Sequence, residues 1–76
     1  MEIKNFISFL EDFLRSFCDD ESIKLDENTT LSELPGWSSM ALVSSLTTIQ
    51  SNFNVVADLD KVYSAITVGD LYKAFQ

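Results

Sequence analysis

Two adjacent serines, Ser38 and Ser39, are the residues of this sequence whose position best suits covalent chemistry. They follow a Leu-Pro-Gly-Trp segment and stand where an amphipathic helix is predicted to begin. A hydroxyl at the first position of a helix is exposed, and the free N–H groups of the first turn favour an attached anion. Ser39 therefore suits the role of an acceptor for a phosphoryl-linked group that another enzyme attaches. The local pattern alone favours a simpler interpretation, in which both serines only cap the helix.

Catalysis by Ser39 itself is not expected, because the chain contains no histidine. Without an imidazole there is no Ser-His or Cys-His pair to activate a nucleophile, and no histidine metal ligand. We therefore predict no catalytic residue and no enzyme activity. A metal site is not expected either, because the acidic residues within 19–27 lack the spacing and the glycine of an EF-hand loop. A solvated acidic loop is the favoured interpretation of that segment.

The charge balance excludes two classes of partner. Twelve Asp and Glu against five Lys and Arg give a net charge of −7, and the five cations are scattered along the chain. A nucleic-acid binder needs clustered cations to displace counterions from phosphate, and an anionic membrane surface repels an acidic chain. We therefore predict no nucleic-acid partner and no membrane partner. Partner proteins are expected to carry positive patches.

Cysteine usage and hydropathy predict a cytoplasmic protein. Cys18 is the single cysteine, so no internal disulfide can form and the chain suits a reducing compartment. The longest unbroken apolar run, residues 40–43, is far too short to span a membrane. Acidic residues also interrupt the N-terminal apolar stretch that a secretory signal would need. We expect a monomer in which Cys18 is a structural thiol rather than a reactive one.

The first element that must position Ser39 is an amphipathic helix. Apolar residues recur at spacings of three and four over residues 3–17, which places them on one helical face. Asp19 and Asp20 would face the negative end of the helix dipole. The helix is therefore expected to end within residues 16–18.

A long connection over residues 19–37 leads into the second predicted helix. Its Pro35-Gly36 pair is typical of the middle of a type II turn. The second helix is predicted over residues 39–53, with Ser38 as the N-cap and Asn54 as the left-handed residue that ends it. Its expected apolar stripe is Leu42, Val43, Leu46, Ile49 and Phe53. The opposite face carries hydroxyls and amides without any charge: Ser44, Ser45, Thr47, Thr48, Ser51 and Asn52.

Two further helices complete the expected fold. A short one is predicted over residues 58–65, and its inward residues are expected to be Leu59, Val62 and Tyr63. A longer one begins at Thr67, whose spacing to Asp70 fits a capping box. The predicted fold is all-α, with a single domain over residues 1–76. It is a small four-helix bundle with three longer helices, one short third helix and a long first loop.

Taken in order, these motifs resemble those of acyl carrier proteins. The matching segments are Leu-Pro-Gly-Trp before the serine pair, Phe-Asn-Val at the end of the second helix and Thr-Val-Gly-Asp-Leu at the start of the last. In that family a four-helix bundle carries 4′-phosphopantetheine on a serine that opens the second helix, usually within Asp-Ser-Leu. The matching triplet here is Ser38-Ser39-Met40. The resemblance therefore implies that Ser39 is the attachment site of the cofactor.

The sequence departs from the family pattern at two places. Ser38 stands where the family has an aspartate, whose carboxylate helps the modifying transferase place its magnesium and coenzyme A. This departure affects the efficiency of modification but not the fold, because serine can also cap a helix. The second departure is the uncharged second helix, where carriers usually present acidic residues to basic patches on partner enzymes. Partners are expected to read this helix by its shape and by neutral hydrogen bonds.

The resemblance implies a carrier and not an enzyme. Such a protein holds acyl groups as thioesters on the 4′-phosphopantetheine arm at Ser39, for fatty-acid, polyketide or related biosynthesis. The implied partners are a phosphopantetheinyl transferase and acyl-transferring, ligase or synthase enzymes. The alternative is a carrier-like protein-interaction module that never takes the cofactor.

Overall fold

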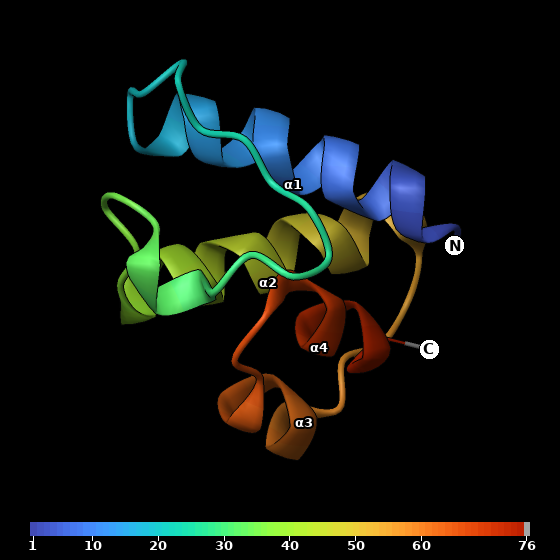
Figure 1. The fold of residues 1–76 in the computed structure, drawn as a ribbon. Coiled ribbons are helices and arrows are strands. Elements are labelled where there is room, and N and C mark those ends of the chain that lie inside the picture. The colour runs from blue at the N-terminus through green and yellow to red at the C-terminus, as the bar shows by residue number, and fades with distance from the viewer. Residues whose placement is uncertain (76) are drawn as a thin grey trace.

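The computed structural model describes residues 1–75, and its regular secondary structure is helical. The elements are α1 (Ile3–Phe17), a 3₁₀ turn η1 (Leu31–Glu33), α2 (Ser39–Phe53), α3 (Leu59–Ser64) and α4 (Val68–Lys73). Figure 1 shows α1 and α2 side by side, with α4 next to them and α3 beyond α4. Helix α1 contacts both α2 and α4. The Cα radius of gyration of 11.0 Å matches the value of about 11 Å expected for a compact chain of this length. The predicted all-α fold with four helices is confirmed.

The prediction that the last helix is one of the longer ones was wrong. Helix α4 has six residues, as does α3. Just after its end, the carbonyl of Ala74 accepts a hydrogen bond of 2.7 Å from the Asp58 N–H, so the backbone there pairs with the segment before α3. Phe75 remains buried outside the helix and forms an isolated β-bridge with Ala57. Phe75 therefore belongs to the core although it lies outside α4.

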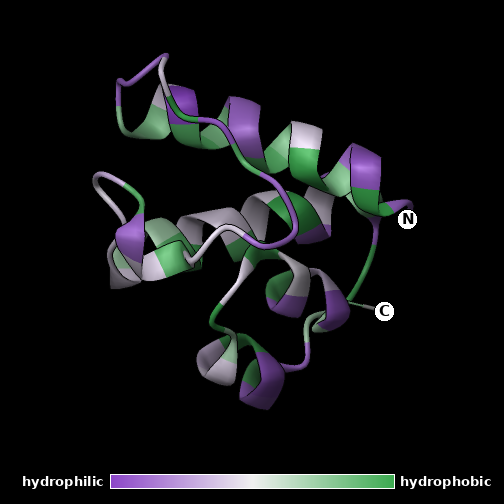
Figure 2. Ribbon diagram, viewed as in Figure 1, coloured by the Kyte–Doolittle hydropathy of each residue, from purple (hydrophilic) through white to green (hydrophobic). Residues whose placement is uncertain are grey.

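The core is built around one row of α1. Phe6, Leu10 and Leu14 lie at spacings of four and are at most 1% exposed. This row packs against α2 and α4, which supply Ile49 and Leu71 to the same cluster. Figure 2 shows hydrophobic and hydrophilic residues alternating around α1, as the sequence spacing predicted. Burial of each large apolar side chain contributes about 1.5–3 kcal/mol.

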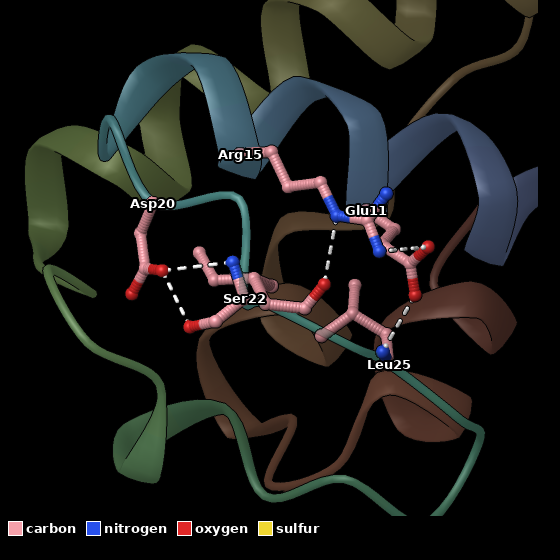
Figure 3. Close-up of polar contacts among 6 residues, drawn as sticks. Glu11, Arg15, Asp20, Ser22 and Leu25 are labelled. Carbon is pink, nitrogen blue, oxygen red and sulfur yellow. Dashed lines mark hydrogen bonds and ion pairs between the residues drawn. The ribbon is translucent and has the colours of Figure 1, made fainter.

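The long connection after α1 is held against that helix by side chains of α1 (Figure 3). The Glu11 carboxylate accepts a hydrogen bond of 2.8 Å from the Leu25 N–H, and the Arg15 Nε donates one of 2.8 Å to the Ile23 carbonyl. Glu11 and Arg15 also form an ion pair of 3.0 Å with each other. The first part of the connection, residues 20–25, therefore runs back along α1 as an ordered segment that we call the strap, with Ile23 buried in the core.

At the start of this strap, Asp20 accepts hydrogen bonds from the hydroxyl and the N–H of Ser22. The hydroxyl bond first, and the backbone bond next, lower the pKa of the Asp20 carboxyl. A lowered pKa means that the folded state favours the charged carboxylate. This contribution to stability is therefore present above the ordinary carboxyl pKa and is lost as the pH falls through the pKa of Asp20 in the folded protein.

None of the helices in residues 1–75 has the length and apolarity that crossing a membrane requires.

Helix α1 ends in a Schellman motif built on an aspartate. Asp19 has the left-handed value φ 51°, the Asp20 N–H donates to the Arg15 carbonyl, and the Asp19 N–H donates to the Ser16 carbonyl. Glycine is the residue that this position favours, because it adopts positive φ without steric cost. The negative charge of Asp19 also opposes the helix dipole.

We therefore expect Asp19→Gly to raise the free energy of unfolding by about 1 kcal/mol, measured by urea denaturation. Asp12→Gly is the matched control, because it removes the same charge from an exposed position inside α1. This control should lower stability by a few tenths of a kcal/mol. A loss of stability in Asp19→Gly would show that the carboxylate itself holds the helix end.

Candidate functional site

Residues 34–37, just before the serine pair, form a tight turn whose geometry requires glycine. Leu34 is extended, Gly36 has φ 76°, and the Trp37 N–H donates a hydrogen bond of 3.2 Å to the Leu34 carbonyl. These values confirm the type II turn predicted from Pro35-Gly36. Gly36 also packs against the end of α1, because a Cβ at this position would lie 2.9 Å from the Sγ of Cys18. The turn that precedes Ser39 is thereby fixed to α1.

Ser38 and Ser39 have different tasks at the start of α2. The Ser38 hydroxyl accepts a hydrogen bond of 3.3 Å from the Ala41 N–H, which confirms it as the N-cap. Ser39 is the first residue of the helix and is exposed. Within residues 1–75 no hydrogen bond occupies its hydroxyl. Ser38 therefore closes the helix end, and the oxygen of Ser39 remains available to another molecule.

Neither a histidine nor a metal-binding group of side chains lies beside Ser39 in residues 1–75. The first turn of α2 also lacks acidic residues, so no carboxylate repels an anion there. The free N–H groups of this turn suit a phosphodiester. The arrangement can accept and hold an anionic group, and it supplies no base that would activate the hydroxyl.

Trp37 anchors the turn rather than lining a cavity. Its side chain is half-buried and packs against the core cluster. Four surface hollows of residues 1–75 are lined by other residues and include neither Trp37 nor Ser39. Any group attached to Ser39 therefore starts on an open surface.

The predicted faces of α2 need two corrections. Ser45, placed on the polar face by the sequence, is fully buried, and Val43, placed in the apolar stripe, is 52% exposed. The buried residues of α2 are Ala41, Ser45, Leu46 and Ile49, so the predicted burial of Leu46 and Ile49 is confirmed. Ser45 fits there because its hydroxyl donates a hydrogen bond of 2.7 Å to the Ala41 carbonyl one turn earlier. The sequence pattern did not predict the burial of Ser45, because it does not show that the hydroxyl can bond to the backbone of its own helix.

The exposed surface of α2 changes character along its length. Next to Ser39 it is apolar, with Met40 72% exposed and Val43 one turn later. Further along, Thr47 donates its hydroxyl to the Val43 carbonyl and Thr48 donates to the Ser44 carbonyl. Because both threonine hydroxyls donate to carbonyls of α2, their oxygens can only accept hydrogen bonds from a partner.

Comparison of the chain with models of known protein families, with curated proteins and with solved structures finds no match in any of the three.

The close approach of Gly36 to Cys18 generates a stability prediction. We expect Gly36→Ala to lower the free energy of unfolding by about 2 kcal/mol, because alanine is strained at φ 76° and its Cβ would collide with the thiol. In a Cys18→Ala background the penalty should shrink but persist, since the strained φ remains. Urea denaturation of the wild type, the two single variants and the double variant separates the cost of the strained φ from the cost of the contact with Cys18. Equal penalties in the two backgrounds would show that the contact with Cys18 carries no energy.

Proposed function

We infer that this protein is an acyl carrier whose Ser39 receives 4′-phosphopantetheine. The observation that carries the proposal is an exposed serine with an unoccupied hydroxyl at the first position of α2, behind a turn fixed to α1. The resemblance of the surrounding motifs to acyl carrier proteins supports the same residue. When attached, the arm supplies a thiol that holds an acyl group as a thioester.

The residues around Ser39 fit an attached phosphodiester. The first-turn N–H groups of α2 face the end where the anion would sit, and no acidic side chain stands in that turn. The chain has no histidine to act as a base, so the transferase takes the proton of the Ser39 hydroxyl. The Ser39 oxygen then forms the phosphodiester by breaking the pyrophosphate bond of coenzyme A, and adenosine 3′,5′-bisphosphate leaves. The protein's own contribution is to present the oxygen and to hold the helix end rigid.

The proposed partners follow from this role. They are a phosphopantetheinyl transferase and the acyl-transferring, ligase or synthase enzymes that load and unload the thiol. We propose a monomeric carrier, without catalytic activity of its own, that acts in fatty-acid, polyketide or related biosynthesis. The single free cysteine favours a reducing compartment, and for that reason we propose the cytoplasm.

A second candidate is an interaction module with the same helices that is never modified. Two observations favour it: Ser38 stands in place of the aspartate found in carriers, and α2 has no charged residue. Both candidates use the surface around Ser39, and they differ in whether its oxygen becomes a phosphodiester. A direct test of modification therefore separates them.

We expect the intact mass to rise by one phosphopantetheinyl group after incubation with coenzyme A, magnesium and a broad-specificity transferase. Ser39→Ala should show no gain. Ser38→Ala is the matched control, because it removes the neighbouring hydroxyl and leaves the oxygen of Ser39 in place. No gain with several transferases, from protein shown to be folded by circular dichroism, would favour the unmodified module. A gain retained in Ser39→Ala would place the modification elsewhere.

Restoring the carboxylate before the modified serine should speed the reaction. We expect Ser38→Asp to increase the initial rate of modification about tenfold, because a carboxylate there can help place the transferase magnesium. Aspartate is as good an N-cap as serine, so the free energy of unfolding should change by less than about 0.5 kcal/mol. Ser38→Asn is the control, because it caps the helix without adding charge. Equal rates for the Asp and Asn variants would contradict a role for the carboxylate.

A further inference from the structure

A hollow between α1 and α2 has a wall without charge. Its volume is about 540 Å³, and it is lined by one residue of α1 and four of α2: Phe9, Thr47, Thr48, Ser51 and Asn52. We call it the α1–α2 hollow. Three other hollows of residues 1–75 are each lined by at least one lysine, arginine or carboxylate. In a chain with a net charge of −7, the α1–α2 hollow is therefore a place where a neutral group can lie without a charged side chain on the wall.

The wall of the α1–α2 hollow combines an aromatic ring with neutral hydrogen-bonding groups. The Phe9 ring is half-buried and packs edge-to-face on Phe53 at the end of α2, with 5.2 Å between the ring centroids. The two threonine oxygens can only accept hydrogen bonds, because both hydroxyls already donate to carbonyls of α2. The serine and the asparagine are exposed and can donate as well as accept. This wall suits a molecule that has amide groups and an apolar end.

The hollow lies within reach of a group attached to Ser39, because both belong to α2. Thr47 is eight residues after Ser39 and Ser51 is twelve, which places them about 12 Å and about 18 Å along the helix axis at 1.5 Å per residue. Both residues lie on the same exposed stripe of α2 as Met40, seven and eleven residues after it. No charged residue interrupts α2 between these positions.

The length of the 4′-phosphopantetheine arm matches this distance. The arm has about thirteen bonds between its phosphorus and its sulfur, and an extended chain spans about 3.5 Å for every three bonds, so the arm spans about 15 Å. Its thiol therefore reaches the level of residues 47–51 on α2. An acyl group on that thiol would lie at the α1–α2 hollow.

We propose that the α1–α2 hollow receives the acyl group of an arm on Ser39, and that the preferred acyl group is uncharged. The threonine oxygens accept hydrogen bonds from the amide N–H groups of the arm, and the apolar end of the acyl group covers the exposed part of the Phe9 ring. A carboxylate at that end would lose hydration without gaining a cation, so acyl groups that carry one are disfavoured. The inference rests on the proposed function, because it requires the modification of Ser39.

The test compares three forms of ¹⁵N-labelled protein, made by a broad-specificity transferase from coenzyme A, butyryl-coenzyme A and succinyl-coenzyme A. The two acyl groups have the same number of carbon atoms and differ in the carboxylate. Relative to the form with the free thiol, the butyryl group should shift the amide signals of Phe9 and of residues 47–52. The succinyl group should shift them roughly threefold less.

Intact mass and amide shifts separate the two possible failures. If no form gains mass, the proposed function is wrong and this inference is wrong with it. Complete modification with butyryl-dependent shifts confined to residues 37–41, or centred on residues 55–75, would overturn this inference alone. Equal shifts from the butyryl and succinyl groups would overturn the preference for an uncharged group.

Matched variants test whether the hollow itself holds the acyl group. Ser51→Leu fills the hollow and should reduce the butyryl-dependent shift of the Phe9 amide roughly fivefold. Ser64→Leu is the control, because it makes the same change at an exposed position of α3 that lines a different hollow, and it should leave the shift unchanged. Both serines are exposed, so circular dichroism should show intact folds, and Asn52→Leu serves if Ser51→Leu unfolds. A full-size shift in the filled variant would contradict the proposal.

Discussion

Burial of the Phe6, Leu10 and Leu14 row of α1 is the constraint on which the other elements depend. Helices of six residues are unstable alone in water, because nucleation costs more than one or two turns return. Both α3 and α4 therefore exist only because the core stabilises them, and α4 reaches it directly through Leu71. The same row fixes α2, whose many Ser and Thr residues give it modest intrinsic helix propensity. The end of α2 that carries Ser39 is positioned by tertiary packing.

Local signals in the sequence predicted the parts of the structure that local chemistry determines. The bounds of α1 and α2, the Ser38 cap, the left-handed Asn54 and the Thr67–Asp70 capping box are all confirmed. Each depends on residues within one or two turns, so a single stretch of sequence contains the whole interaction. The position of Ser39 was predictable for the same reason. Its modification is a matter of partner chemistry and stays a prediction.

The features that the sequence did not reveal depend on distant contacts. The backbone just after α4 pairs with Asp58, and the ordered path of the long connection is set by Glu11 and Arg15 of α1. Leu59 and Tyr63 were predicted to point inward with Val62, but they are 56% and 68% exposed and only Val62 is buried, because spacing alone is equally compatible with burial and exposure. Hydrophobic periodicity identifies a helix face without saying whether a neighbour will cover it.

The pairing of residues 27–31 with residues 66–69 bears on how the chain folds. The Val68 N–H donates to the Thr29 carbonyl and the Gly69 N–H donates to the Glu27 carbonyl, beside the bond between Leu31 and Ile66. These bonds join segments separated by more than a helix-loop-helix unit, so closing that loop costs entropy before any bond forms. Pairs so distant in sequence raise the contact order of this otherwise local helical fold, and a higher contact order slows folding.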